Sequence, residues 1–302
     1  MKKTEPQLTI TGVEREVGLS KDVLRVWERR YGFPAPLRDH NDERLYPANQ
    51  VEKLRLVKRL MDQGHRPGRL LSQSPEALEQ LALAPRAGAA AESGPPGHPA
   101  MGELLACLRS KDGARLVERL QQLLGAEGLA RFVQDIVVPM SARVGEEWAR
   151  GELQVYEEHL FSEGCTRVLR QAIAALPPGR SPRVLLTTVP DEPHALGLLM
   201  VESLLALQGA RCIGLGTQTP LGELARAART YGADVVALSF STAFPSRRVP
   251  ALLQELRAAL PGAVELWVGG GAVRRLAAVT GVCLLPTLAD AVAAVQAWQA
   301  RR

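Results

Sequence analysis

Apolar positions at the amino-terminal end of the chain recur at helical spacing between short turn sequences. This spacing predicts a helix over Leu8–Val17, a turn at Gly18-Leu19 and a second helix that follows Ser20 and runs to Arg30. Ser20 is a typical N-cap residue because its hydroxyl can accept a hydrogen bond from the first helical turn. Farther on, the pattern predicts a small hairpin over 37–46 and another helix over Asn49–Gln63.

The middle of the chain has helical spacing throughout. Large apolar residues return every three or four positions, and four such stretches fit into the segment 101–178. Helices joined by short loops pack as neighbours, so this segment is predicted to form a compact four-helix bundle. The positions that define it are Leu104, Leu105, Leu108, Leu116, Leu120, Leu123, Phe132, Ile136, Leu160, Val168 and Ile173.

The last part of the chain alternates between short apolar runs, which predict buried strands, and stretches of helical spacing. This alternation predicts a five-strand, doubly wound parallel sheet of Rossmann-like type, which binds ligands at the carboxyl ends of its strands. The predicted strands are Arg183–Val189, Arg211–Leu215, Asp234–Phe240, Glu265–Gly269 and Val282–Leu285, and the predicted helices are 195–208, 221–231, 248–260, 272–280 and 288–300.

Composition separates these parts. Residues 84–100 are dominated by Ala, Gly and Pro, which cannot bury enough apolar surface to order themselves, and they predict a flexible linker. A shorter Pro-rich stretch occupies 177–182. We therefore expect a multidomain α and α/β protein with a head over 1–83, the bundle over 101–178 and the sheet domain over 183–302.

Charge is concentrated in the head. The chain of 302 residues has a formal net charge of +5, and residues 1–75 alone hold 15 Lys and Arg against 10 Asp and Glu. The remaining residues hold 22 of each kind and are neutral. The excess therefore indicates a small basic module attached to a neutral remainder, the arrangement expected of a nucleic-acid-binding head.

Several classes of protein are excluded by composition. The four cysteines are far apart and form no C-x-x-C pair, so a zinc ribbon and a disulfide scaffold are not expected. Glu202 interrupts the longest apolar stretch, Leu196–Leu207, and no hydrophobic segment follows the charges of Met1-Lys2-Lys3. We therefore expect a cytoplasmic protein with no membrane span and no signal peptide.

The second predicted helix places its basic residues on one face. Val23, Leu24 and Trp27 can face the core, and Lys21, Arg25 and Arg29 then share the opposite face, which can enter a major groove. Arg38, His40 and Arg44 of the hairpin add side chains that can reach phosphates. A basic helix that is merely solvated is the alternative interpretation of this pattern.

The order of these elements favours DNA binding. The run Leu24-Arg25-Val26-Trp27-Glu28-Arg29-Arg30-Tyr31-Gly32-Phe33-Pro34, followed by Pro36, Arg38, Arg44 and Tyr46, resembles the winged helix-turn-helix of the MerR family of transcription regulators over residues 8–75. Glu43 departs from the family, which often has Gly there. The resemblance implies contacts with double-stranded operator DNA by Lys21, Arg25, Arg29, Arg30, Tyr31, Arg38, His40, Arg44 and Tyr46.

His194 follows the first predicted strand of the sheet domain, where a ligand would bind. A neutral imidazole can ligate a transition metal, and Glu192 can accept a hydrogen bond from the other ring nitrogen. A surface histidine without a metal is the alternative. The pattern Glu192-x-His194-x-x-Gly197, with Ser239-x-Ser241 and Gly269-Gly270-Gly271, resembles the cobalamin-binding domain of corrinoid enzymes and regulators.

The intervals between these motifs match that family: 41 residues lie between Gly197 and Ser239, and 27 between Ser241 and Gly269. Glu192 replaces the usual Asp and Ser241 the usual Leu. The resemblance implies that His194 is the lower cobalt ligand and that the sheet domain binds the cofactor through Glu192, His194, Gly197, Ser239, Ser241, Gly269 and Gly270.

Trp148 in the bundle is followed after nine residues by Glu158-His159. A core Trp and a surface Glu-His pair would explain these residues without a ligand. The Trp-x9-Glu-His pattern nevertheless resembles light-sensing, adenosylcobalamin-dependent repressors of the CarH/LitR type. The resemblance implies that Trp148, Glu158 and His159 cover the upper cobalt face, with Val155 as an apolar wall. Some members have His directly after this Trp, where this chain has Ala149.

Taken over the whole chain, the resemblance implies a repressor, and no enzyme, with adenosylcobalamin and its cobalt as chromophore. A dark tetramer would bind operator DNA near carotenoid-synthesis genes, and light would break the Co–C bond and leave a smaller species. The alternatives are a MerR-type regulator that needs no cobalamin or binds another tetrapyrrole, and a corrinoid methyl-carrier protein. A methyl carrier needs access to the upper face and has no use for a DNA-reading head.

Overall fold

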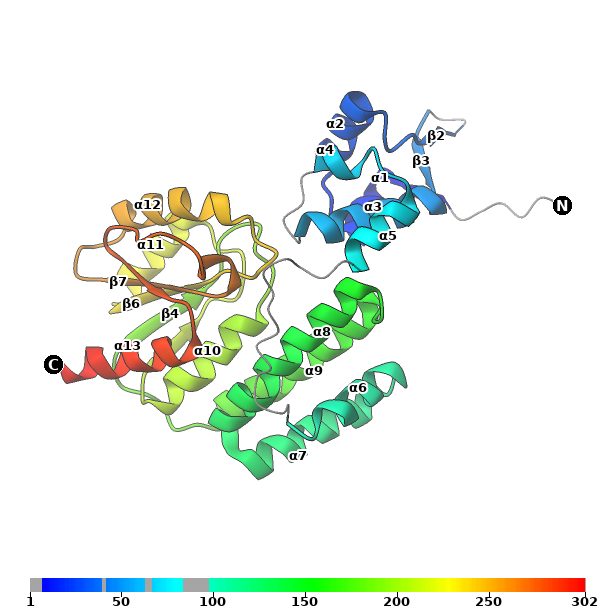
Figure 1. Cartoon of the computed structure of the whole chain (residues 1–302). Helices are drawn as coiled ribbons and strands as arrows, with labels where there is room; N and C mark the ends of the chain where they lie inside the picture. The colour runs from blue at the N-terminus through cyan, green and yellow to red at the C-terminus, as the bar shows by residue number, and fades with distance from the viewer. Residues whose placement is uncertain (1–6, 40–41, 63–66, 84–97, 302) are drawn as a thin grey trace. The chain divides into compact units, whose positions relative to one another are not determined.

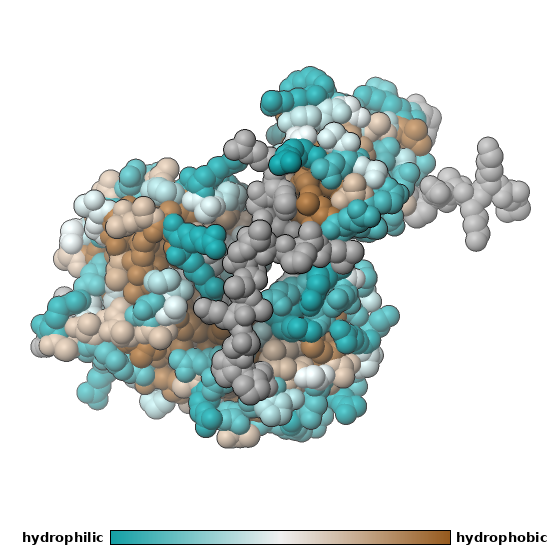
Figure 2. All heavy atoms as spheres, in the orientation of Figure 1, coloured by the Kyte–Doolittle hydropathy of each residue, from teal (hydrophilic) through white to brown (hydrophobic). Residues whose placement is uncertain are grey.

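A computed structural model describes residues 7–39, 42–62, 67–83 and 98–301 (Figure 1). The chain divides into two compact units, 1–92 and 93–302. Most of the predicted linker, residues 84–97, lies outside the described residues. On the face visible in Figure 2, hydrophilic and hydrophobic residues are interspersed on both units.

The first unit is a winged helix-turn-helix. Helices α1 (Ile10–Val17) and α2 (Lys21–Tyr31) are joined by a tight turn, and the Ser20 hydroxyl accepts a hydrogen bond from the Val23 amide, as its N-cap position predicts. Strands β2 (Leu37–Arg38) and β3 (Arg44–Pro47) form the predicted hairpin. The remaining helices are α3 (Ala48–Asp62), α4 (Pro67–Leu70) and α5 (Pro75–Leu83), of which the last two were not predicted.

The predicted helix over Leu8–Val17 is wrong in its first two residues. Strand β1 (Gln7–Thr9) precedes α1 and pairs antiparallel with β3, which gives a three-stranded sheet in the order β1-β3-β2. The Thr9 hydroxyl caps α1 by accepting a hydrogen bond from the Gly12 amide. At Leu8, pairing with a strand distant in sequence overrides the local helical pattern. The prediction failed there because local spacing carries no information about that partner.

The second unit begins with the predicted bundle. Its helices are α6 (Met101–Arg109), α7 (Gly113–Arg131), α8 (Val138–Arg150) and α9 (Val155–Ala174), and a π-helical segment over Phe132–Val137 connects α7 to α8. The predicted apolar positions Leu104, Leu120 and Phe132 are fully buried in one core. A π segment widens the helix locally and is frequent at functional sites.

A five-stranded parallel sheet follows, in the order β5-β4-β6-β7-β8. Helices α10 and α13 pack on one face, and α11 and α12 pack on the other. Strand order therefore reverses between β4 and β6, where doubly wound sheets bind ligands. The bounds are β4 (Arg183–Thr187), α10 (Leu196–Leu207), β5 (Arg211–Gly214), α11 (Leu221–Thr230), β6 (Val235–Ser239), α12 (Val249–Ala259), β7 (Glu265–Gly269), β8 (Val282–Leu285) and α13 (Leu288–Ala300).

The predicted helix over 272–280 is wrong. Only a 3-10 turn, Gly271–Val273, forms there, and the rest of the segment is irregular up to β8. Val279 and Thr280 are β-branched and favour helix weakly. Burial of Val273 in the sheet core instead fixes the start of the segment as a loop at the carboxyl edge of the sheet.

The described residues contain no helix long and apolar enough to cross a membrane. All four cysteines are unpaired, and burial raises the pKa of the Cys212 thiol to about 12.

One ionic cluster connects the helices of the bundle. Glu147 of α8 is completely buried, and its carboxylate accepts hydrogen bonds from Arg109 Nη2 of α6 at 2.9 Å and Arg143 Nε at 2.8 Å. The Glu147 carbonyl also accepts the amide of Glu152 at 2.8 Å, which fixes the turn after α8. Both arginines are partly exposed, so they compensate a buried charge from the rim of the bundle.

Replacing Arg109 and Arg143 together by Ala is expected to lower the free energy of unfolding by about 3–5 kcal/mol, since it leaves the Glu147 carboxylate buried without a cation. The measurement is urea unfolding of the full chain followed by circular dichroism. Arg119→Ala is the control: Arg119 pairs with the exposed Glu103 at 2.7 Å, and such a pair is worth less than about 1 kcal/mol. Equal losses in the two variants would contradict a special role for Glu147.

Candidate cofactor site and DNA-binding surface

The loop between β4 and α10 carries His194 at the carboxyl edge of the sheet. Glu192 of the same loop is 1% exposed, and its Oε1 atom lies 2.6 Å from His194 Nδ1. Ser241, in the loop after β6, donates to Glu192 Oε2 through its amide at 2.8 Å and its hydroxyl at 2.9 Å. Glu192 therefore joins the two loops that flank the point where strand order reverses.

Electrostatics keep Glu192 ionised. Burial raises the pKa of this carboxyl, but hydrogen bonds from His194 and from the Ser241 amide outweigh burial and bring the pKa below its usual range. A carboxylate at Nδ1 orients the ring, an arrangement that many metal-binding histidines share. The Ser241 hydroxyl, which stands where the cobalamin-binding pattern has Leu, is the second support of this carboxylate.

A cavity of about 580 Å³ lies next to this loop, between the carboxyl half of the sheet and helices α10 and α13. It brings together Gly197, Ser239, Gly269 and Gly270, which the sequence predicted to contact one cofactor. The cavity walls are mostly apolar. The lining residues are Gln134, Asp135, Val138, Gly197, Met200, Val201, Leu205, Ala237, Leu238, Ser239, Trp267, Val268, Gly269, Gly270, Gly271, Arg274, Leu285, Pro286, Thr287, Leu288, Ala289 and Ala291.

Two glycines of the cavity lining lie in close contact with neighbouring segments. Gly270 has φ of 99°, and a Cβ atom there would collide with the Phe240 carbonyl oxygen. At Gly197, a Cβ atom would lie 3.1 Å from the Ser239 hydroxyl. The absence of a side chain therefore lets the loop after β7 pack against the loop after β6, and α10 pack against the end of β6.

The predicted cap residues lie on either side of the turn between α8 and α9, near the end of α8 and at the start of α9. Trp148 is partly buried against the bundle core, and Val155 is 44% exposed at the start of α9. Glu158 accepts a hydrogen bond from the Ser162 hydroxyl at 2.6 Å and lies 3.6 Å from His159 Nε2. His159 is exposed, so apolar, acidic and imidazole groups are all available along one turn.

Three charged or amide side chains in the cavity lining were not predicted. Gln134 and Asp135 come from the π segment of the bundle, and Arg274 follows the 3-10 turn after β7. Neither segment carries a sequence motif. Gln134 and Asp135 reach the cavity because the bundle packs on α10, and Arg274 reaches it because a loop forms where a helix was predicted. Only the Gly269-Gly270-Gly271 run, three residues before Arg274, signalled a nearby ligand.

The head presents a basic surface on α2 and the hairpin. Arg25, Arg29, Arg30, Tyr31 and Arg38 are exposed. The Arg30 guanidinium lies 5.4 Å from the centre of the Tyr31 ring, and Arg38 pairs with Asp42 at 2.8 Å. These side chains lie on the surface that the sequence predicted.

The other predicted DNA contacts are held in place within the head. Lys21 lies 3.7 Å from Glu14, and Arg44 Nε lies 2.9 Å from Glu28 Oε2, an ion pair that raises the pKa of Arg44. Tyr46 is completely buried, so the structure does not bring it to the DNA-facing surface. His40 lies outside the described residues.

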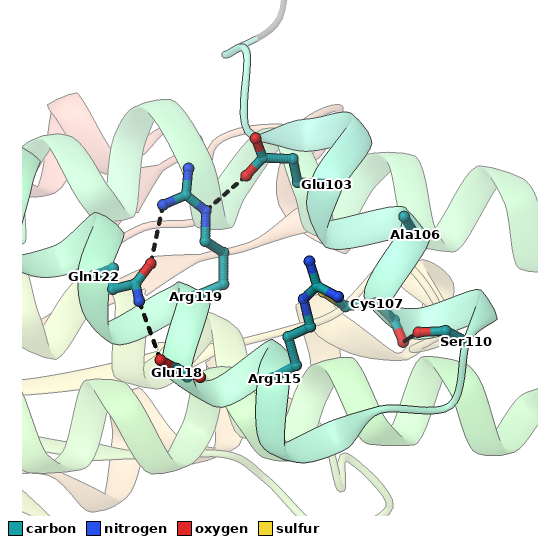
Figure 3. A pocket seen from close by; sticks show the side chains of 8 residues that line it. All are labelled: Glu103, Ala106, Cys107, Ser110, Arg115, Glu118, Arg119 and Gln122. Carbon is teal, nitrogen blue, oxygen red and sulfur yellow. Dashed lines mark hydrogen bonds and ion pairs between the residues drawn. The ribbon is translucent and has the colours of Figure 1, made fainter.

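A separate pocket of about 660 Å³ lies between α6 and α7 (Figure 3). Arg119 crosses it to Glu103 at 2.7 Å and to Gln122 at 3.1 Å, with Arg115 and Cys107 among the other lining residues. None of the predicted site residues lines this pocket.

Comparison with protein families assigns all three parts of the chain. Residues 8–69 match the MerR HTH family of regulatory proteins. Residues 102–176 and residues 182–284 match two models, each described as a B12 binding domain. The helical bundle and the parallel sheet therefore both belong to cobalamin-binding families.

A solved structure of similar fold is the monomethylamine corrinoid protein of Methanosarcina barkeri. It has a TM-score of 0.53 and 16% sequence identity, and the match covers 65% of this chain and 96% of that one. At this identity the likeness concerns the fold of the bundle and the sheet.

Two relatives share nearly the whole chain. The HTH-type transcriptional repressor CarH of Myxococcus xanthus is 33% identical over 265 residues, 87% of this chain and 88% of the relative. The HTH-type transcriptional repressor CarA of the same organism is 32% identical over 283 residues, 90% of each chain. The chain therefore belongs to the family of MerR-type transcriptional repressors with B12 binding domains.

Proposed function

We propose that this protein is a light-responsive repressor that uses adenosylcobalamin as its chromophore and controls carotenoid-synthesis genes. The observation that carries the cofactor assignment is the His194–Glu192 pair, with Nδ1 and Oε1 at 2.6 Å, beside a cavity lined by Gly197, Ser239 and Gly269. A single imidazole ligand suits a metal whose equatorial positions a macrocycle already fills, as in cobalamin. The residues present fit this cofactor.

In this proposal the sheet domain holds the lower side. His194 Nε2 ligates cobalt, and Glu192 and Ser241 keep the ring oriented and basic through their hydrogen bonds. Gly197, Ser239, Gly269 and Gly270 line the cavity for the nucleotide tail. All of these residues lie at the carboxyl edge of the sheet, in its loops or at the adjoining ends of α10, β6 and β7.

The bundle covers the upper side. Trp148 packs against the adenosyl group, Glu158 and His159 offer hydrogen bonds to it, and Val155 supplies an apolar surface. The bound cofactor supplies a Co–C bond that visible light can break. Loss of the adenosyl group would remove the packing partner of Trp148, which directly follows the buried Glu147 near the end of α8. The turn between α8 and α9 is therefore the part of the bundle that responds.

Assembly provides the switch for DNA binding. The head carries the basic surface, and its modest charge gives a single head weak affinity for an operator. In a tetramer formed in the dark, several heads act together, and their effective concentration at one operator raises the affinity. A smaller species in the light loses this gain and releases DNA. Such a regulator acts in the cytoplasm and needs no catalytic residue.

Replacing His194 by Ala is expected to weaken adenosylcobalamin binding by more than about tenfold, because the axial ligand is lost and even its outer-shell partners are worth that much in other metal sites. Absorption titration measures the affinity and the change of axial ligand together. His98→Ala, a histidine near Glu127 in the bundle unit, is the matched control. Unchanged affinity and spectrum in the His194 variant would rule out ligation by this residue.

Size-exclusion chromatography of the protein with adenosylcobalamin, with absorption recorded across the peak, tests the light response. The wild type is expected to elute as a larger species in the dark and as a smaller one after illumination. Trp148→Ala should not form the dark species, whereas Trp148→Phe should retain part of it because an aromatic ring remains. A wild type unchanged by light, or a dark species that survives Trp148→Ala, would contradict the proposed switch.

Replacing Arg25 or Arg29 by Ala is expected to weaken DNA binding and to reduce the slope of log K against log salt by about one for each phosphate that is no longer neutralised. The probe is a duplex selected by the wild type from a random library. The cobalamin spectrum should not change. Arg226→Ala is the control, since Arg226 is exposed in the second unit and pairs with Glu223. Normal binding by both head variants would place the interface elsewhere.

A further inference from the structure

The cavity beside His194 has one cationic side chain, to which the proposed cofactor contacts assign no role. Arg274 lines it together with Gly269, Gly270 and Gly271, and it is the only Lys, Arg or His among the lining residues, all of which are described. Its side chain is exposed, and it makes no ion pair or hydrogen bond with the described residues. Arg274 therefore lies at the rim with its charge uncompensated.

The inner wall of the cavity is apolar. Trp267 is 1% exposed and Leu238 is 4% exposed, and Met200 of α10 also lines the cavity. A cation at the rim of an apolar cavity suits a ligand with a flat apolar end and an anionic group next to it. A ligand that fits this cavity therefore carries a flat apolar group and an anionic group on the same side arm.

Other charges near the cavity do not cancel that of Arg274. Asp135 lines the bundle side, and its carboxylate lies 3.7 Å from Arg131 Nε. The Asp290 carboxylate accepts hydrogen bonds from the Thr287 amide at 2.9 Å and hydroxyl at 2.6 Å in the cap of α13. The first-turn residues of α13, Leu288 and Ala289, line the cavity, so the positive end of this helix acts in the same direction as Arg274.

We propose that Arg274 binds the phosphodiester of the cofactor's nucleotide tail and makes the protein selective for corrinoids that carry this tail. The inference rests on the proposed function, in which cobalamin binds with its tail in this cavity. Cobalamin joins its aromatic base to the corrin ring through one phosphodiester, which matches an apolar cavity with a cation at the rim. A guanidinium is well suited to phosphate because it can donate two parallel hydrogen bonds.

The test compares two ligands that differ only in this tail. Adenosylcobalamin and adenosylcobinamide share the corrin ring and the adenosyl group, and cobinamide lacks the nucleotide and its phosphodiester. Affinities of the full chain for both are measured by absorption titration in the dark. Arg274→Ala is expected to weaken adenosylcobalamin binding by about tenfold, the value of one charge-assisted hydrogen bond, and to leave adenosylcobinamide binding unchanged.

Arg275→Ala is the matched control, because Arg275 is the adjacent exposed arginine and does not line the cavity. Arg274→Gln, which keeps most of the side-chain volume, should give the same selective loss and replaces Arg274→Ala if that variant does not fold. Raising the salt concentration should weaken adenosylcobalamin binding more in the wild type than in Arg274→Gln, since salt screens an exposed ion pair.

Each remaining outcome is decisive. Equal loss for both ligands would mean that Arg274 contacts the corrin or supports the loop, and it would overturn the inference. An undiminished affinity for adenosylcobalamin, or the same selective loss in Arg275→Ala, would overturn it as well. A wild type that binds neither ligand would instead show that the proposed function fails, which separates the two failures.

Discussion

The candidate cofactor site depends on the hydrogen bonds made to the buried carboxylate of Glu192. An ionised group that is 1% exposed is stable only when its oxygens are hydrogen-bonded, and here the partners come from His194 and from Ser241. These partners lie in two loops that follow neighbouring strands, β4 and β6. One side chain therefore connects the two loops and orients the imidazole.

Much of this architecture could be predicted because it depends on local periodicity. All five strands and four of the five helices of the sheet domain lie where apolar spacing placed them, and Ser20 begins α2 as expected. The errors share a cause. Leu8 joins a strand whose partner is distant in sequence, and the segment after Gly271 stays irregular while it buries Val273 in a core formed by other elements.

The same limit applies to the site. Motif spacing predicted that Glu192, His194 and Gly197 lie at one edge of the sheet. It could not distinguish the exposed residues of the head from the buried ones. Tyr46 belongs to the motif that resembles DNA-binding proteins and yet lies in the core, and Arg44 pairs with Glu28. Among the described residues of α2 and the hairpin, the basic side chains exposed to solvent are Arg25, Arg29, Arg30 and Arg38.

Helix α10, which begins two residues after His194, is apolar on more than one side. Leu198 and Leu205 pack in the core under the sheet, whereas Leu199, Met200 and Leu204 pack in the core of the bundle. Because α10 contributes to both cores, its unfolding would expose apolar surface in the bundle and in the sheet domain. The slowest amide hydrogens of the two parts should therefore exchange together, as in one cooperative unit. The His194 loop thus leads directly into a helix that packs in the core of the bundle.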